Sequence, residues 1–440
     1  MNAMYKQIIN YLTNDIYPFH MPGHKRNPLF MPPNLHELDL TEIPGMDVLS
    51  SPTGMIYDLQ KKVANFYGAD HSFLLVNGSS AGIIAAICAT CSDGDTIIIP
   101  RNAHASVYNG LVLSGAFPMY IMPQVTKDGL AGGVCPSAFD DMPNGAAALV
   151  VSPTYEGFVS DIRAIAQKVH SRGGILIVDE AHGAHFAFHK RFPVSALELG
   201  ADIVIQSLHK TLPALSQTAV LHVKDGRVDI NRVKFLLNAV QTSSPSYILM
   251  SVCDFILQKL WAQPKLFEIY VERLDKFRTS MPADGAIFLQ HHEGSAIFDT
   301  DPGKLLFATQ LDANAIARIM SCKYKVQMEM AAGQHILAMT SVADTQAGFE
   351  RLRRAIEGIS TKACGTPRVV SPTKAVDIPE MVFHPRQATY MPSREIPWQE
   401  SVGQISAQLI AQYPPGIVLV APGERIPAGI PKQSETIRVI

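Results

Sequence analysis

The hydrophobic residues in the first half of this chain are concentrated in short runs at fairly regular intervals. Six of these runs are rich in aliphatic residues and are bounded by polar or turn-forming residues; they span 72–77, 95–100, 147–152, 174–179, 202–207 and 218–223. Continuous apolar runs of this length are typical of strands that are buried on both faces, as in a parallel sheet. The pattern therefore predicts a mostly parallel β-sheet.

The segments between these runs have the features of helices that connect parallel strands. Residues 161–172 form an amphipathic segment, and Gly173 and Gly174 follow it as a helix stop. An alternation of strands and helices predicts an α/β doubly wound domain over residues 46–265.

Three further regions flank this predicted domain. Residues 266–362 alternate helix-like and strand-like patterns with fewer long apolar runs, which predicts a smaller α+β domain. A stretch rich in Pro, Ser and Thr then leads into a last module over residues 363–440. Residues 1–45 form an arm with many prolines and no clear period. Two interpretations of this arm stay open: a Pro-stiffened strap over the core, or a loop that borders a site.

Composition and charge exclude several classes of protein. With 440 residues, 47% of them apolar, the chain can bury a large core, so a disordered or fibrous protein is excluded. The formal charge of -2 leaves no basic field for nucleic acid, so small molecules or other subunits are the expected partners. The sequence shows no secretory signal and no apolar run of about 20 residues, which predicts a cytoplasmic protein without a membrane segment.

The cysteines support the same prediction. Six cysteines are scattered along the chain, which is typical of a reducing compartment rather than of a secreted disulfide framework. Cys88 and Cys91 form a C-x-x-C pair inside an apolar run, with no second pair to complete a metal site. Buried helical thiols are the favoured interpretation.

The first candidate site element follows the run at 72–77, which leads directly into Gly78-Ser79-Ser80 and an apolar, helix-like segment. Glycine permits close backbone approach, hydroxyls donate hydrogen bonds, and free N–H groups at a helix N-terminus favour an anion. The segment indicates a phosphate cradle, although Gly-Ser turns also serve as ordinary helix caps.

Two further candidates lie at the predicted carboxyl edge of the sheet. Asp179 ends the run at 174–179, and Lys210 follows the run at 202–207 between apolar flanks. Ligands of open α/β sheets bind at this edge, and a partly desolvated lysine has the lowered pKa that reaction with an aldehyde requires. Ser207 and His209, beside Lys210, can both turn toward a phosphate.

The residues around Asp179 allow two other interpretations, and neither is favoured. Residues 179–182 read D-E-A-H, as in helicases, but the chain contains no G-x-x-x-x-G-K-[ST] phosphate loop. His182, His185 and His189 suggest a metal cluster, but they lack a matching cysteine or carboxylate frame. Hydrogen-bonded loop histidines without a metal are the favoured interpretation.

A phosphate cradle, a carboxylate and an amine in this order are the protein contacts that pyridoxal 5'-phosphate requires. The carboxylate of Asp179 would keep the pyridine nitrogen protonated, and Lys210 would hold the cofactor as a Schiff base. The sequence therefore predicts an enzyme that depends on this cofactor.

At this point the sequence resembles a known family, the bacterial ornithine/lysine/arginine decarboxylases of fold type I, over nearly the whole chain. The resemblance rests on eight ordered motifs: FHMPGHK at 19–25, DLTEIPGMDVL at 39–49, LVNGSSAG at 75–82, RNAHASV at 101–107, DEAHGAH at 179–185, QSLHKTLPAL at 206–215, QTSSPSY at 241–247 and YPPGIVLVAPGE at 413–424. It implies a mostly parallel seven-stranded sheet with smaller α+β domains toward the C-terminus.

The resemblance also implies roles for individual residues. His104 matches a histidine that stacks on the cofactor ring and takes part in catalysis with Lys210 and Asp179. The expected cofactor neighbours are Gly78, Ser79, Ser80, His104, Asp179, His182, Ser207, His209 and Lys210. Ser243 and Ser244 match a loop that crosses to the partner subunit's cofactor, which implies a homodimer with shared active sites. Glu424 matches a position that closes the site and would bind the cationic end of the substrate; the alternative is a loop glutamate in solvent.

The sequence departs from the family pattern at three positions and in length. Gln404 and Gln408 stand where the family usually has Arg and Glu, and Val418 replaces a common proline. The long N-terminal wing domain of the large acid-stress enzymes is not found, so a higher oligomer than a dimer and the choice of substrate stay open.

The expected activity is decarboxylation of lysine, arginine or ornithine to the corresponding diamine or agmatine. Two alternatives share every cofactor contact. One is an aminotransferase or aldol-type lyase on the same fold, and the other is a cofactor-binding protein without catalytic activity.

Overall fold

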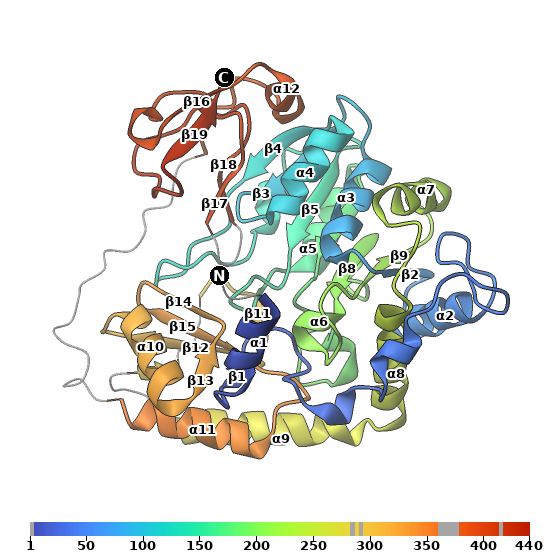
Figure 1. Ribbon diagram of the computed structural model, residues 1–440. Coiled ribbons are helices and arrows are strands. Elements are labelled where there is room, and N and C mark those ends of the chain that lie inside the picture. Colours follow the sequence, from blue (N-terminus) through green and yellow to red (C-terminus); the bar gives the residue numbers. More distant parts are fainter. Residues whose placement is uncertain (1–3, 282–286, 290–293, 360–377, 413–416) are drawn as a thin grey trace.

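The computed structural model describes residues 4–281, 287–289, 294–359, 378–412 and 417–440. Its centre is a seven-stranded sheet in the order β2-β9-β8-β7-β5-β3-β4 (Figure 1). The strands, in that order, are His71–Leu75, Ala219–Val223, Ile203–Ser207, Leu176–Asp179, Ala147–Val151, Thr96–Pro100 and Phe117–Ile121. Strand β9 runs antiparallel to both of its neighbours, and the other neighbouring pairs are parallel.

The six apolar runs all form strands of this sheet, and the mostly parallel α/β fold is confirmed. The seventh strand, β4, was missed by the hydrophobic pattern. It lies at the edge of the sheet and contains Pro118, a residue that argues against a strand in a sequence pattern and that sheets accept mainly in edge strands.

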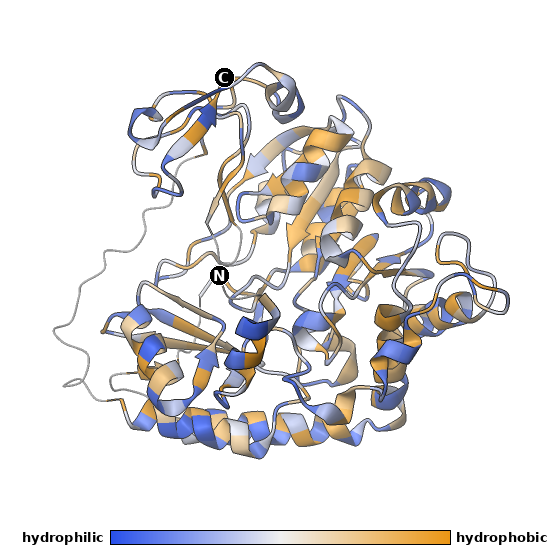
Figure 2. Cartoon of the chain, in the orientation of Figure 1, coloured by the Kyte–Doolittle hydropathy of each residue, from blue (hydrophilic) through white to orange (hydrophobic). Residues whose placement is uncertain are grey.

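Helices cover both faces of the sheet, which gives three layers. One face packs against α3 (Gly78–Thr90), α4 (Ala105–Ser114) and α7 (Ile230–Val240), and the other against α2 (Met55–Tyr67), α5 (Ile162–Ser171) and α8 (Tyr247–Ala262). Ile203 and Ile205 belong to the first core and Val204 to the second, because successive side chains of a strand point to opposite faces. Figure 2 shows the resulting apolar strands at the centre of the molecule.

Helix α5 illustrates why the predicted crossover helices form. The side chain of Asp161 caps it by accepting a hydrogen bond from the N–H of Ala164 at 3.0 Å. Its buried residues share one face, and Gly173 follows with a φ of 70° that favours glycine. The segment predicted at 161–172 is thereby confirmed as a helix.

A second, antiparallel sheet has the order β10-β12-β15-β14, with strands Ile287–Leu289, Lys304–Thr309, His335–Met339 and Met330–Ala332. The helices of this part are α9 (Lys265–Ser280), α10 (Ala313–Tyr324) and α11 (Gln346–Glu357). Two short pairs complete it: β6 (Phe158–Val159) with β11 (Asp299–Thr300), and β1 (Tyr17–Phe19) with β13 (Val326–Met328). The β1 pairing fastens the N-terminal arm, which begins with helix α1 (Met4–Leu12), to this smaller part.

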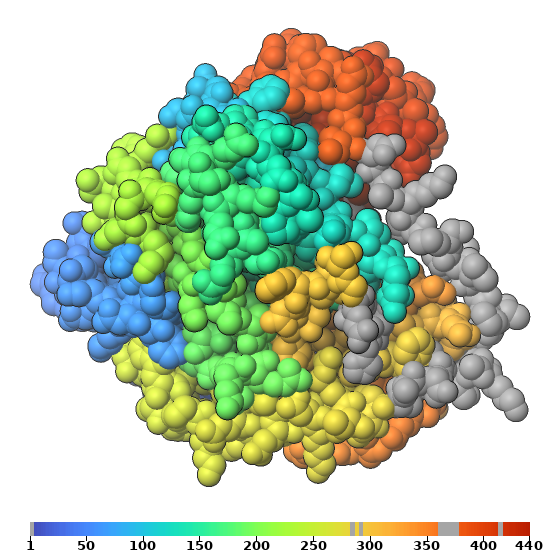
Figure 3. Space-filling model, turned by 180° about the vertical axis from the view of Figure 1, so that it is seen from behind, coloured from blue at the N-terminus to red at the C-terminus, as the bar shows by residue number. Residues whose placement is uncertain are grey.

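The C-terminal module contains α12 (Pro385–Tyr390) and two small sheets, β16-β19 (Arg394–Pro397 with Thr436–Val439) and β17-β18 (Ile410–Gln412 with Ile417–Val420). It lies against the β3-β4 side of the main sheet, as the view from behind in Figure 3 also shows. There, Nε2 of His384 lies 2.9 Å from the carbonyl oxygen of Ala116, and Arg386 forms an ion pair with Asp93. Most of the predicted linker and residues 413–416 of the last motif lie outside the described residues.

Among the helices of the described ranges, none combines the length and the apolar character that crossing a membrane requires.

Candidate functional site

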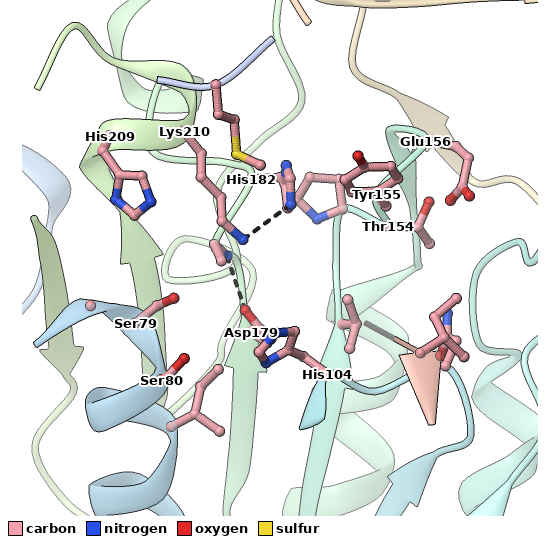
Figure 4. Close-up of a pocket in the computed structure, with 18 of the residues that line it drawn as sticks. Ser79, Ser80, His104, Thr154, Tyr155, Glu156, Asp179, His182, His209 and Lys210 are labelled. Atoms are coloured by element: carbon pink, nitrogen blue, oxygen red, sulfur yellow. Dashed lines mark hydrogen bonds between the residues drawn. The ribbon is translucent and has the colours of Figure 1, made fainter. Parts of the chain in front are cut away.

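A cavity of about 500 Å³ opens at the carboxyl edge of the main sheet (Figure 4). The loops that follow β2, β3, β5, β7 and β8 all contribute to its wall, as expected for an open α/β sheet. The lining residues include Met21, Gly78, Ser79, Ser80, Asn102, His104, Thr154, Tyr155, Glu156, Asp179, His182, His209, Lys210, Gln217 and Ile417.

The start of helix α3 forms one end of the cavity. Gly78 has a φ of 76°, which an L side chain rarely adopts, and its N–H donates to the carbonyl oxygen of Gln217 at 2.8 Å. Asn77 is the N-cap residue, but its side chain accepts no hydrogen bond from the helix and instead donates to the carbonyl oxygen of Val240 at 3.2 Å. The first turn therefore presents the hydroxyls of Ser79 and Ser80, together with the positive end of the helix, to the cavity.

Ser207 does not line the cavity and lies behind Ser79. It is fully buried, and its hydroxyl donates to Oγ of Ser79 at 2.8 Å. The expectation that Ser207 faces a phosphate directly is therefore corrected. Because Oγ of Ser79 accepts the hydrogen bond from Ser207, the hydroxyl of Ser79 can donate its own proton to an anion in the cavity.

His209 lies at the same end of the cavity. Its Nδ1 lies 3.0 Å from the carbonyl oxygen of Thr218, so Nδ1 carries the proton and Nε2 is free to face a ligand. Burial lowers the pKa of His209 below its ordinary value, and this hydrogen bond to Thr218 opposes the shift. An anion beside the ring would favour its protonated form.

Asp179 and Lys210 are brought together by neighbouring parallel strands. Asp179 ends β7, where it pairs with Ile205 of β8, and Lys210 lies in the short helix α6 (Leu208–Thr211) that begins directly after β8. The side chain of Asp179 is 5% exposed, and one of its oxygens accepts from the N–H of Ala181 at 3.2 Å. Burial lowers the pKa of the Lys210 amine, and the Asp179 carboxylate opposes this shift. Such an amine is a suitable nucleophile for a carbonyl group.

His104 lies on the β3 side of the cavity as the N-cap of α4. Its Nδ1 faces the backbone N–H of Ser106 at 3.2 Å and the hydroxyl of Ser106 at 2.9 Å, which fixes the ring orientation. The backbone of His104 also forms a β-bridge with Ile417. The C-terminal module therefore closes this wall of the cavity.

His182 lies between two lysines, and one of them was not anticipated. Its Nε2 is 3.2 Å from Nζ of Lys210, and its Nδ1 is 2.7 Å from Nζ of Lys304 on β12. The neighbouring His185 has a different partner, the carboxylate of Asp301 at 3.2 Å. Within the described ranges, no group of three or more His, Cys, Asp or Glu residues has a geometry that could hold a metal ion.

Other wall residues were missed by sequence reasoning. Thr154, Tyr155 and Glu156 follow β5 directly, so the polar segment after the run at 147–152 was a signal that could have identified them. Burial raises the pKa of Glu156. Met21 of the N-terminal arm also lines the cavity, so the arm both spans the core and borders the site.

Glu424 does not lie in the cavity wall. It is fully buried, and its two carboxylate oxygens accept hydrogen bonds from the guanidinium of Arg101 at 2.7 and 2.6 Å. It also accepts from the N–H of Ala421. Because these donors occupy its carboxylate, the expectation that Glu424 offers a free anion to a substrate is corrected.

Ser243 and Ser244 lie apart from the cavity of their own chain. Both are exposed on the loop between α7 and α8. Their expected contact with a partner subunit's site therefore stays a prediction.

The cavity suits a phosphorylated aromatic aldehyde. It has a helix N-terminus with two hydroxyls at one end, a buried carboxylate at its floor, and an amine and an imidazole that flank the space between them. These are the groups needed to hold a phosphate, pair with a ring nitrogen, react with an aldehyde and cover a ring face. The structure thus brings Ser79, Ser80, His104, Asp179 and Lys210 to one cavity.

Comparison with known proteins agrees with this geometry. A model of "Orn/Lys/Arg decarboxylase, major domain" matches residues 2–308, and a model of the C-terminal domain of the same decarboxylases matches residues 371–437. An arginine decarboxylase of Bacillus anthracis is 29% identical, over 99% of this chain and 97% of the relative. An arginine decarboxylase of Bacillus subtilis strain 168 is 31% identical, over 96% of this chain and 91% of the relative.

A solved structure extends the similarity to the fold. The lysine decarboxylase of Francisella novicida superposes with a TM-score of 0.78, at 18% identity, over 99% of this chain and 83% of that chain.

Proposed function

The chain belongs to the Orn/Lys/Arg decarboxylase family, and from this premise we propose that it decarboxylates a basic amino acid with pyridoxal 5'-phosphate held at Lys210. The observation that carries the cofactor proposal is the meeting of Lys210, Asp179 and the Ser79-Ser80 helix start in one cavity. When bound, the cofactor supplies an electron sink for the pair of electrons that the departing carboxylate leaves on the α-carbon.

Each side chain then has a distinct task. Ser79, Ser80 and His209 would bind the phosphate, and Asp179 would pair with the protonated ring nitrogen. The imidazole of His104 would cover one face of the ring. Lys210 would hold the cofactor, and its amine would move a proton at the α-carbon of the substrate.

We propose arginine as the substrate. Both relatives reported above, which match nearly the whole chain, are arginine decarboxylases. A guanidinium needs a carboxylate partner, and Glu156 offers one in the cavity wall. Figure 4 places Glu156 across the cavity from Ser79 and Lys210, where the far end of a substrate joined near Lys210 would lie. Glu156 therefore replaces Glu424 as the proposed partner of the distal cation.

The proposed assembly is a cytoplasmic homodimer with shared sites. The exposed Ser243-Ser244 loop would complete the partner's cavity at the phosphate end. The cysteines of the described ranges are free, which fits a reducing compartment.

Product analysis tests the proposed reaction. The purified protein, loaded with pyridoxal 5'-phosphate, is incubated with arginine, lysine or ornithine, and carbon dioxide and amine products are measured. We expect agmatine and carbon dioxide in equal amounts from arginine. In a parallel reaction that contains 2-oxoglutarate as the amino-group acceptor, keto acid in place of carbon dioxide would indicate an aminotransferase, and a bound cofactor without turnover of any of the three would favour an inactive binding protein.

A further inference from the structure

A chain of three nitrogen-bearing side chains runs from the cavity into the smaller part of the molecule. Nζ of Lys210, the two ring nitrogens of His182 and Nζ of Lys304 follow one another at 3.2 and 2.7 Å. His182 is 8% exposed and Lys304 is 5% exposed, so water has little access to either. The function proposed above assigns a task to Lys210 but none to the buried Lys304.

The hydrogen-bonding capacity of His182 restricts the charges of the two lysines. Burial lowers the pKa of His182 well below its ordinary value, and a positive charge on a neighbouring lysine adds to this shift, so the ring is neutral. A neutral imidazole has one N–H donor and one lone pair, whereas an ammonium group can only donate. Two ammonium groups cannot satisfy both contacts, so at least one of the two lysines is a free amine that accepts from the imidazole N–H.

The surroundings decide which lysine carries the charge. Burial lowers the pKa of Lys304, and the carboxylates of Asp301, Glu329 and Glu156 oppose this shift by favouring the charged form, so that the net pKa is about 8. The 2.7 Å contact to Nδ1 is also short, as expected for a charged donor. Nδ1 of His182 therefore accepts from Lys304, and Nε2–H donates to the lone pair of Lys210.

We propose that Lys304 is a positioning residue that acts through His182: it holds Lys210 as a free amine and returns a proton to it when Lys210 must act as an acid. This inference deepens the proposed function and rests on the role of Lys210 in it. A free amine is the form that attacks a carbonyl, and an ammonium is the form that delivers a proton to carbon.

The proton return is a balanced step within the protein. An N–H bond of the Lys304 ammonium breaks as Nδ1 of His182 takes that proton, while the Nε2–H bond breaks and its proton joins the Lys210 amine. One positive charge moves from Lys304 to Lys210, His182 changes only its tautomer, and no electron is gained or lost.

Other charged groups lie near these three side chains and influence which of the two lysines holds the proton. Asp179 and Glu329 favour the charged form of Lys210, whereas His104 and His209 face His182 from the cavity side. Glu329 is held in place by the hydroxyl of Tyr155 at 2.8 Å and the N–H of Met21 at 2.9 Å. Carboxylates thus lie near both Lys210 and Lys304, so either lysine can hold the proton.

The test measures the reactivity of the Lys210 amine in the cofactor-free protein. Lysines are labelled with acetic anhydride at a series of pH values, and mass spectrometry follows the labelling of the peptide that contains Lys210. The pH at which its labelling rate is half of the maximum is the Lys210 midpoint. Lys304→Met removes the charge and the donor to Nδ1, so Nε2 can accept from a Lys210 ammonium. We expect the Lys210 midpoint to rise by about one pH unit. An unchanged or lower midpoint would overturn the proposal.

Lys25→Met is the matched control, because Lys25 is 6% exposed but donates to the backbone carbonyls of His20 and Met339 and not to His182. It should leave the Lys210 midpoint unchanged. The labelling needs neither cofactor nor substrate, so its outcome is separate from that of the product analysis.

Lys304→Arg tests the proton return and remains informative if Lys304→Met does not fold. A guanidinium keeps the charge and the donor but does not release a proton. We expect a Lys210 midpoint close to that of the unaltered protein, together with turnover that is lower by about 10-fold or more. Unaltered turnover, or a midpoint raised as in Lys304→Met, would contradict the proposal.

Discussion

Glu424 and Arg101 form a buried ion pair that joins the C-terminal module to the main domain. Both hydrogen bonds of the pair are shorter than 2.8 Å, and Arg101 also donates to the carbonyl oxygen of Leu419. The guanidinium further lies 4.7 Å from the ring centre of Tyr120. The position that sequence similarity suggested for substrate binding thus connects two parts of the chain.

Glu424→Gln should therefore reduce stability more than it reduces substrate binding. Removing one partner leaves the Arg101 charge buried and unpaired, which costs about 3–5 kcal/mol of unfolding free energy. Urea denaturation measures this loss, and the double variant Arg101→Met/Glu424→Leu should lose less than Glu424→Gln alone. Unaltered stability with a raised KM would instead support a contact with substrate.

Lys210→Ala should abolish both catalysis and the visible absorbance band of the bound cofactor, because no other described residue places an amine at this point of the cavity wall. Absorbance spectra and the agmatine assay check this. Lys276→Ala, on the outer face of α9, is the control and should change neither signal. Turnover by Lys210→Ala would refute the proposed role of Lys210.

Asp179→Asn should keep the shape of the site but lose the negative charge at the ring nitrogen. We expect turnover to fall by about 100-fold or more, because a preorganised charge at the reacting centre is lost. Cofactor affinity, measured by equilibrium dialysis, should fall as well. An active Asp179→Asn variant would show that the ring nitrogen does not pair with this carboxylate.

His209 should take up a proton when a phosphate binds. Burial lowers its pKa, and a neighbouring phosphate dianion raises the pKa again, so affinity for the phosphate should fall as the pH rises between the two pKa values. Calorimetry with 4'-deoxypyridoxine 5'-phosphate, which has no aldehyde, in buffers of different ionisation enthalpy measures this uptake. His209→Gln still donates a hydrogen bond but does not titrate, so proton uptake should disappear with it.

Glu156→Gln should weaken recognition of the substrate's distal cation. A hydrogen bond to a charged group contributes about 1.5–3 kcal/mol, so kcat/KM for arginine should fall by about 10- to 100-fold. Cofactor absorbance should be unchanged, and Glu357→Gln on the exposed side of α11 is the control. An equal loss of cofactor binding would place Glu156 with the cofactor rather than with the substrate.

The sequence predicted the meeting of Asp179 and Lys210 because both follow parallel strands, and parallel strands end at one edge of a sheet. It could not predict the contact between His182 and Lys304, which are 122 residues apart, or the pairing of Arg101 with Glu424 across 323 residues. These contacts depend on how parts of the chain that are distant in sequence pack together. Strand β4 was missed for a local reason, since it contains Pro118, which argues against a strand although an edge strand accepts it.

Met21 and Ile417 line the same cavity although almost the whole chain separates them. A ribosome adds Ile417 long after Met21, so a nascent chain that has not yet reached Ile417 lacks part of the wall. The cavity is therefore completed only after Ile417 has been synthesised. Cofactor capture becomes a late event in the life of each new molecule, and a prematurely terminated product would compete poorly for the cellular supply of cofactor.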